Sequence, residues 1–209
     1  MVLVESIFLL HTLSIRLLLF GFTMSLSTFK LQKGFTLIEV LIAFIILSFG
    51  LLGAVALQAK AKQASFDSMQ RAAAVALGND IIQRIRANDT SQLATLYDLE
   101  FTSETSINSS TTCFTSSCSN AQIASLDIEQ WKRAIRAREN TGSLDGATVC
   151  INPESVAGSG GKAFNIEVIV SWQGRQEFKA SEATGKISCG VADKRRRLVV
   201  LTSYIYVRS

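Results

Sequence analysis

The segment that decides the fold lies near the start of the chain and reads KLQKGFTLIEVLIAFIILSFG, residues 30–50. A short basic stretch ends at Gly34. An apolar stretch then runs from Phe35 to Leu57, and Glu39 is its only charged residue. As a helix, at about 1.5 Å per residue, this stretch spans roughly 34 Å, enough to cross a hydrocarbon core of ~30 Å with some tilt. We therefore predict a transmembrane helix over residues 35–57.

The junction before this helix has an unusual order. A secretory signal is cleaved after its apolar region, beside small residues, whereas here the small residue Gly34 precedes the apolar region. A basic leader ending in Gly, then Phe, then Thr-Leu-Ile-Glu at the head of a long apolar helix resembles the class III leader of type IV prepilins. The resemblance covers about 25 residues, and the combination is specific.

This resemblance implies a processing pathway and a location. A prepilin peptidase would cut between Gly34 and Phe35, removing residues 1–34 as a leader, and would methylate the new amine of Phe35. The retained helix would cross the bacterial inner membrane once, place the rest of the chain in the periplasm, and later pack into the pilus. The implied partners are the peptidase, other major and minor pilins, and the inner-membrane assembly machinery.

Glu39 is the strongest candidate for an assembly residue. An ionised carboxylate inside an apolar span is costly unless it is paired, and such residues are usually functional. The resemblance implies that Glu39 pairs with the cationic Phe35 amine of a neighbouring subunit, and at 4 Å this gains about 4 kcal/mol at an effective dielectric near 20. The alternative is that Glu39 lies at interfacial depth and only complements the helix dipole.

Residues 1–23 do not fit a short hydrophilic leader, because they contain a second apolar stretch, from Ile7 to Phe22. A start at Met24 gives a leader of the expected length and character. We interpret residues 1–23 as an over-extended gene start, and a true second hydrophobic segment is the alternative. Basic residues flank the anchor on both sides, so the orientation rests on the resemblance and the cysteines.

Helical periodicity continues beyond the membrane. Between Phe35 and Arg86 the chain has no proline, and apolar residues recur every three or four positions, at Phe66, Met69, Ala73, Leu77, Ile81 and Ile85. We predict one helix ending near Asn88, so that residues 58–88 form its periplasmic half, with Asp80 and Arg84 mostly on other faces. Major pilins commonly have a proline about twenty residues into this helix. Ala56 lies there instead, which counts mildly against a major subunit.

Residues 89–209 are predicted to form a globular α+β domain, the type IV pilin fold of a long helix on an antiparallel sheet. We expect an irregular loop from Thr90 to Ser117, then a capping box of Ser119 and Gln122 that begins a short helix with Trp131 in the core. Alternation of apolar and polar residues predicts four strands, at Ala147–Ile151, Ala163–Trp172, Arg175–Ala180 and Leu198–Val207. We place Pro153 in a turn and Gln173-Gly174 in a hairpin turn.

The four cysteines, Cys113, Cys118, Cys150 and Cys189, predict two disulfides if the domain is exported. Their spacing does not match the two close pairs of a zinc ribbon. Cys113 and Cys118 are close enough to form a small loop, and Cys150 with Cys189 would then staple two strand regions. Three connectivities nevertheless remain open, because sequence does not choose among them.

A finer resemblance is to minor pilins of the PilV type. It rests on individually weak motifs spread over most of the chain: Gly50-Leu51-Leu52-Gly53, Cys113…Cys118-Ser119, Leu126-Asp127-Ile128-Glu129-Gln130-Trp131, Val170-Ser171-Trp172 and Arg195-Arg196-Arg197-Leu198. It implies a low-abundance structural subunit that primes or modifies pilus assembly. A pseudopilin of a type II secretion system is the nearest alternative.

Other functional classes have little support. A DNA-uptake pilin rests only on the run Lys194–Arg197 in a chain of net charge +4, and a solvated or internally paired edge is the more ordinary interpretation, so nucleic acid is not expected as a partner. The only histidine, His11, lies in the N-terminal apolar stretch, so we expect neither histidine catalysis nor a histidine-ligated metal in the globular part. No phosphate loop or nucleophile elbow is present, so we predict no enzyme activity and no cofactor.

Overall fold

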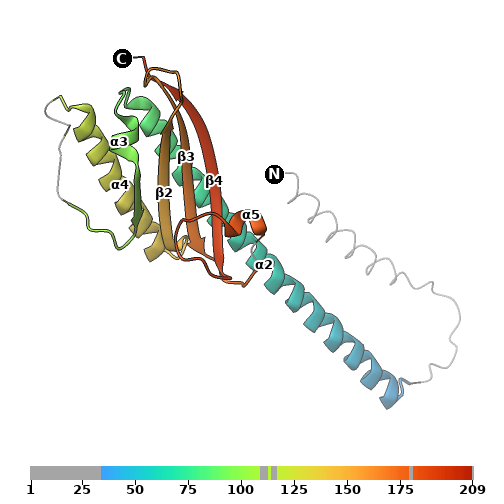
Figure 1. The fold of residues 1–209 in the computed structure, drawn as a ribbon. Coiled ribbons are helices and arrows are strands. Elements are labelled where there is room, and N and C mark those ends of the chain that lie inside the picture. The colour runs from blue at the N-terminus through green and yellow to red at the C-terminus, as the bar shows by residue number, and fades with distance from the viewer. Residues whose placement is uncertain (1–33, 109–112, 114–116, 179–180, 209) are drawn as a thin grey trace, which may run out of the picture. The chain divides into compact units, whose positions relative to one another are not determined.

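The structure, a computed structural model, describes residues 34–108, 113, 117–178 and 181–208 (Figure 1). The chain divides into two compact units, Met1–Ala54 and Val55–Ser209. Our predictions for residues 1–33, including the leader, the Met24 start and the first apolar stretch, lie outside the described residues.

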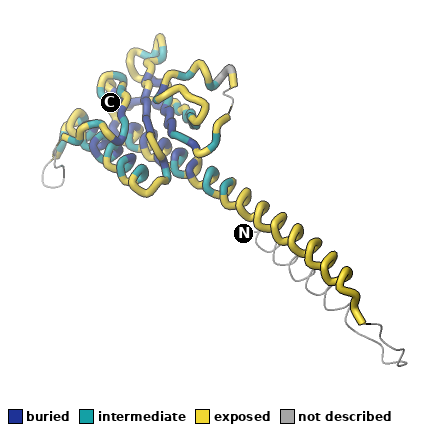
Figure 2. The backbone as a smooth tube through the Cα atoms, turned by 90° about the horizontal axis from the view of Figure 1, so that it is seen from below, coloured by how far each residue is buried: buried dark blue, intermediate teal, exposed yellow. Residues whose placement is uncertain are grey.

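Helix α2 (Leu37–Ala87) confirms the single long helix that the periodicity predicts. Every α2 residue in the first unit is exposed, as the yellow tube in Figure 2 shows. By length and composition, α2 is the one helix in the described part of the chain that could cross a membrane. Its buried residues all lie in the second unit and include Leu77, Ile81 and Ile85. The uniformly apolar half therefore has no protein core around it, whereas the amphipathic half does.

The second unit contains a four-stranded antiparallel sheet in the order β1-β2-β3-β4. Its strands are β1 (Leu99–Thr102), β2 (Asp145–Ser155), β3 (Ala163–Gln173) and β4 (Arg196–Tyr206). The register aligns Phe101, Val149, Val170 and Val199 across all four strands. Because side chains alternate between faces, these residues and their i±2 neighbours form one apolar face.

Helices cover this apolar face. Gly78 of α2 lies so close to β3 and β4 that an added Cβ would be 2.4 Å from Leu201 Cδ1. Helix α4 (Asn120–Asn140) and the short α3 (Leu93–Tyr97) contact the β1–β2 half of the sheet. Trp131 of α4 is only 1% exposed and stacks on Phe101 with ring centroids 6.5 Å apart. The predicted core position of Trp131 is confirmed, and the long helix on an antiparallel sheet is the pilin α+β fold.

A smaller core lies on the opposite face of the sheet. There Cys150 of β2 forms a disulfide with Cys189, in the segment that joins β3 to β4 and contains α5 (Glu182–Gly185). Both cysteines pack with Ile169. Gly190 follows with φ of +70°, and an added Cβ would be 2.3 Å from Ser171 Oγ. Only glycine fits both this backbone conformation and this close approach to the sheet.

The predicted hairpin at Gln173-Gly174 is wrong, since β3 is followed by irregular chain and α5 rather than by a strand. The described part of the predicted strand Arg175–Ala180, residues 175–178, is not a strand. The segment instead borders the start of β4, because Gly174 N–H donates to Arg195 O and Phe178 N–H donates to Lys194 O. The two-residue turn was a reasonable local signal, but contacts with residues about twenty positions later determine the path.

Two further predictions need correction. The expected loop from Thr90 to Ser117 contains α3 and β1, whose apolar residues Leu93, Tyr97 and Phe101 are buried. Pro153 lies inside β2 rather than in a turn. The N–H of Val156 faces β3, since it donates to Ala163 O. Backbone N–H groups alternate sides along a strand, so the nitrogen of Pro153 faces the other side, that of β1. The pairing of β2 with β1 stops at Ile151, before Pro153. A missing N–H is tolerated at such a locally unpaired edge.

The two disulfides provide a matched test of the fold. Cys113–Cys118 closes a loop with a sequence separation of 5, and Cys150–Cys189 closes one with a separation of 39. Chain-entropy arguments predict that replacing Cys150 and Cys189 by alanine lowers the free energy of unfolding by about 2 kcal/mol more than replacing Cys113 and Cys118. Denaturant unfolding of the two double variants measures the difference. Equal losses, or a larger loss for the short loop, would contradict this account.

Candidate assembly sites

The junction at Gly34 and Phe35 is an exposed peptide segment. Residues 34–36 have no regular secondary structure, and the Phe35 side chain is 84% exposed. An added Cβ at Gly34 would meet no atom within 4 Å. The segment is therefore open to an enzyme that reads an extended peptide, and no contact of the described fold competes for it.

Thr36 begins α2. Its carbonyl oxygen accepts from the N–H of Glu39 at 3.1 Å, and its Oγ1 is 3.4 Å from the same nitrogen. This arrangement is one half of a capping box, with Glu39 in the first turn of the helix. The exposed Glu39 carboxylate therefore lies one turn from the Phe35 nitrogen. This geometry is compatible with both the capping and the pairing interpretation.

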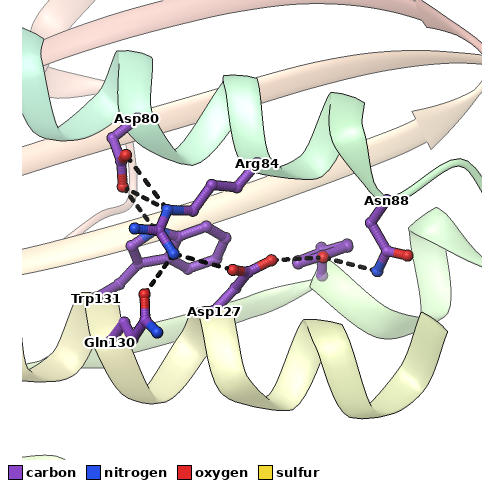
Figure 3. Close-up of polar contacts among 7 residues, drawn as sticks. Asp80, Arg84, Asn88, Asp127, Gln130 and Trp131 are labelled. Atoms are coloured by element: carbon purple, nitrogen blue, oxygen red, sulfur yellow. Dashed lines mark hydrogen bonds and ion pairs between the residues drawn. The ribbon is translucent and has the colours of Figure 1, made fainter. Parts of the chain in front are cut away.

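A polar cluster, exposed at Asp80 and buried at Asp127 and Asn88, joins α2 to α4 in the second unit (Figure 3). Arg84 of α2 is its centre: its Nε lies 3.1 Å from Asp80 Oδ2, and its Nη1 lies 3.1 Å from Asp127 Oδ1 on α4. The same Nη1 also donates to Gln130. Trp131 completes this side by donating its indole Nε1–H to Asp80 at 3.1 Å.

The cluster extends to Tyr97 and Asn88. The Tyr97 hydroxyl donates to Asp127 Oδ2 at 3.2 Å and accepts from Asn88 Nδ2 at 2.9 Å. Asn88 also donates to the carbonyl oxygen of Asn120, at the start of α4. The last turns of α2 and the following Asn88 thus bond to α4 at two places. One is its first residue, Asn120, and the other is the stretch from Asp127 to Trp131, two to three turns later. These bonds set the register of the two helices, which apolar packing alone would leave loose.

Burial and charge have opposite effects in this cluster. Burial lowers the pKa of the Arg84 guanidinium, but Asp127 and Asp80 raise it to above its ordinary value. Burial raises the pKa of the Asp127 carboxyl, and Arg84 and Tyr97 offset this only in part. Burial also raises the pKa of the Tyr97 phenol, so it remains a donor at neutral pH. Asp127 is thus incompletely compensated, because its own side chain is 10% exposed while that of its partner Arg84 is 37% exposed.

Two family models match consecutive parts of the chain. The prokaryotic N-terminal methylation motif matches residues 29–55, which include Gly34, Phe35 and Glu39. A family described as type IV pilin Tt1218 matches residues 56–129, from α2 to the first half of α4. Over residues 29–129 the chain is therefore similar to type IV pilins. No curated protein and no solved structure is significantly similar to it.

The family that matches residues 56–129 is a structural, non-enzymatic pilin family, which agrees with the prediction that this protein is not an enzyme. The methylation motif implies processing by a prepilin peptidase and entry into pilus assembly, and the apolar helix suggests the inner membrane or the pilus as its location. Among the described residues, no group of three or more His, Cys, Asp or Glu side chains is placed to hold a metal ion.

Half of the basic run Lys194–Arg197 is bonded inside the domain. Arg196 donates to the carbonyl oxygens of Ile187, Cys189 and Thr184, and Arg197 donates to that of Gln176. Asp193 accepts the backbone N–H groups of Arg195 and Arg196 through its Oδ1. Two of the four basic side chains therefore hold the segment between β3 and β4 in place. This favours the internally engaged interpretation over a nucleic-acid surface.

The cysteines and the polar cluster differ in how far the sequence revealed them. The structure pairs Cys113 with Cys118 and Cys150 with Cys189, one of the three connectivities that the sequence left open. Sequence analysis missed the polar cluster entirely. A signal was present: Asp80, Arg84 and Asn88 follow at i, i+4 and i+8, so they share one helix face. Their partner Asp127 lies too far along the chain to be inferred.

The pH dependence of stability tests the cluster. Since the pKa of Asp127 is raised on folding, the folded state holds a proton that the unfolded state has released, and its stabilising contribution is lost as pH rises from about 3.8 through the folded pKa. The Asp127→Asn variant has no carboxyl group to titrate. We therefore expect the stability of the wild type relative to this variant to fall as the pH rises from about 3.5 to about 7, a range that begins near the ordinary pKa of a carboxyl and extends above it.

Urea unfolding across this pH range measures the difference, and Asp98→Asn at an exposed position serves as the matched control. A wild type that gains stability relative to Asp127→Asn as pH rises would contradict the assignment.

Proposed function

We propose that this pilin is a minor subunit of the PilV type that takes part in assembling or modifying a type IV pilus. The observation that carries the proposal is the junction at Gly34 and Phe35, an exposed linear segment directly before a long apolar helix. A second observation favours a minor over a major subunit: the position where major pilins commonly have proline is Ala56, inside an unbroken α2. The disulfide-bonded α+β unit supplies a surface for contacts with other subunits.

Processing at the junction is the first step of the proposed function. A prepilin peptidase would cleave between Gly34 and Phe35 and methylate the Phe35 amine. Residues 35–57 would then anchor the mature subunit in the inner membrane, with residues 58–88 and the domain of residues 89–209 in the periplasm. Two disulfides suit an oxidising compartment, which supports this orientation.

Glu39 would act in the second step. Cleavage creates a cation at Phe35, and a carboxylate one turn along an otherwise apolar helix has no other charge nearby in residues 35–57. In a filament core of packed apolar helices, pairing Glu39 with the Phe35 amine of a neighbouring subunit would offset the burial of both charges. The pair would also determine the axial register, because any other register leaves two buried charges unpaired.

Processing is tested by the N-terminal residue and intact mass of the membrane-extracted protein, with and without active peptidase. We expect a species beginning with N-methylated Phe35 only when the peptidase is active. Gly34→Leu should block its formation, since the peptidase must accommodate the residue before the cut. Gly50→Leu is the matched control because both glycines have open space around them. Wild-type protein that keeps its leader in peptidase-positive cells would refute the pilin function.

Incorporation into pili tests Glu39 and the minor role together. Removing a pair worth about 4 kcal/mol predicts that Glu39→Ala enters pili at less than about a tenth of the wild-type level, although it is still processed. Glu39→Asp keeps the charge and should recover part of the incorporation. Quantitative mass spectrometry of sheared pili measures this and the stoichiometry. Wild-type incorporation of Glu39→Ala would remove the role of Glu39, and abundance equal to that of the major subunit would refute the minor role.

A further inference from the structure

The two edges of the sheet in the second unit differ in how they are protected. At one edge, β1 has only 4 residues, and the N–H of Thr102 already donates to Thr105 Oγ1 at 2.8 Å. At the other edge, β4 has 11 residues and pairs with β3 on one side (Figure 1). Natural sheets protect their edges by short strands, charges, proline, bulges or a covering segment. The short edge at β1 follows this rule, so the long edge at β4 is the one that needs an explanation.

The backbone groups on the outer side of β4 have no partner in the domain. The N–H of Val207 donates to Lys162 O at 2.7 Å, so it faces the β3 side. Backbone groups of successive residues alternate sides along a strand. The residues whose N–H and C=O groups therefore face away from β3 are Leu198, Val200, Thr202, Tyr204 and Tyr206. Within the described part of the chain, no hydrogen bond reaches these outward groups, and the last three of these residues are exposed.

The sequence of β4 also lacks the usual protection of an edge. From Leu198 to Val207 it reads LVVLTSYIYV, with no charged residue, proline or glycine. The pairing with β3 is regular, from Ala163 opposite Tyr206 to Gln173 opposite Arg196, so no bulge turns the edge away. Such an edge is a template for strand addition. Its donors and acceptors repeat at the spacing of a strand, and an extended peptide backbone is what complements them.

The direction of β4 limits which chain can pair with it. Contacts between α2 and β4 follow the same order along both elements: Gly78 with Leu201, Arg86 with Ser203, and then Asp89 with Arg208 just beyond them. The two elements therefore run in the same direction. Antiparallel pairing with the β4 of a second copy would make the two α2 helices run in opposite directions. Two copies anchored in one membrane do not allow this, and this step rests on the function proposed above.

Charges at both ends of β4 also disfavour a second copy. Lys194 and Arg195 are exposed just before the strand, and Arg208 is exposed after it. The nearby carboxylates of Asp193 and Asp89 each accept a backbone N–H, from Arg195 and Arg208 respectively. A second β4 would bring the basic ends together if antiparallel, and would place each end beside its own copy if parallel. Like charges opposite each other are destabilising, whereas acidic residues at these positions would be attracted.

We propose that the outer edge of β4 receives an extended segment of a different protein chain, which adds to the sheet as a further antiparallel strand. The segment is uncharged in its middle and acidic at its ends. Its backbone bonds to the outward groups of β4, from Leu198 to Tyr206. Its side chains lie beside Val200, Thr202 and Tyr204, where β-branched and aromatic residues form favourable cross-strand pairs.

Amide hydrogen exchange tests the added strand directly. The protein is the full-length ¹⁵N-labelled chain in a non-ionic detergent. The probe is a blocked peptide, Glu-Thr-Val-Thr-Ile-Thr-Val-Thr-Glu, N-methylated at every second residue so that it has one free edge and cannot pair with itself on both sides. At saturation, exchange of the outward amides of Val200, Thr202 and Tyr204 should slow by about tenfold or more, because it then requires the peptide to leave. The same peptide N-methylated at every residue is the control and should have no effect.

Two variants at one position isolate the backbone contribution. Thr202→Pro removes an outward N–H that β3 does not use, and proline is tolerated at such a position. We expect it to abolish the protection of Val200 and Tyr204 by the peptide. Thr202→Ala is the matched control, because it shortens the side chain but keeps the N–H, and it should respond as the wild type does. Slow exchange of the inward amides of Leu201 and Ser203 shows that β4 still pairs with β3 in both variants.

Each outcome decides one part of the proposal. Outward amides that the one-edge peptide does not protect, or that the fully methylated peptide protects equally, would overturn the edge site whether or not Thr202→Pro folds. Protection that appears without peptide and rises with protein concentration would overturn the different chain as the partner. Equal binding of a peptide with lysine in place of both glutamates would overturn the acidic ends. The titration needs no peptidase and no pilus, so its failure beside normal Phe35 processing leaves the proposed function intact.

Discussion

The second unit depends on the packing of α2 on two sides at once. One face of the helix lies against the sheet through Leu77, Ile81 and Ile85, and Gly78 allows the close approach to Leu201. A side chain at position 78 would separate helix and sheet or displace Leu201, and overpacking of this kind is destabilising. The neighbouring face carries Arg84, whose bonds to α4 fix how that helix lies on the β1–β2 half of the sheet. The core between helices and strands therefore follows from the placement of one helix.

Sequence patterns correctly predicted the elements whose conformation depends on residues close by in the chain. The length of α2 follows from apolar periodicity without proline, and Ser119 with Gln122 forms the complete capping box that the sequence predicted for α4. The same reasoning failed after β3, where Gly174 has the chemistry of a tight turn but bonds to Arg195 instead. It also failed for β1, which has only four residues and takes its conformation from β2. The conformation of such a short edge strand depends on the strand that it pairs with, and the periodicity of its own sequence does not indicate that strand.

The charged residues illustrate a related limit of sequence analysis. Arg84 and Arg196 look alike in the sequence, as members of polar faces or basic runs, yet both are used inside the domain. Arg84 bonds to residues 43 and 46 positions away, and Arg196 bonds to carbonyl oxygens of the segment that Cys189 pins to the sheet. Both guanidinium groups are therefore already hydrogen-bonded within the domain. Composition records how many charges a chain has, whereas function depends on which of them remain unengaged.

The two units differ in how their polar sites arise. The proposed sites at Gly34, Phe35 and Glu39 are a peptide and a carboxylate in sequence order, so the sequence alone indicates them and the fold contributes exposure. In the second unit, Arg84 contacts Asp127, which lies 43 positions later, so their pairing exists only in the folded domain. Removing one partner of such a pair leaves the other polar group without its bond, which costs more free energy than the intact pair contributes. The long-range pairing that fixes α4 against α2 is therefore supplied by the fold and not by sequence order.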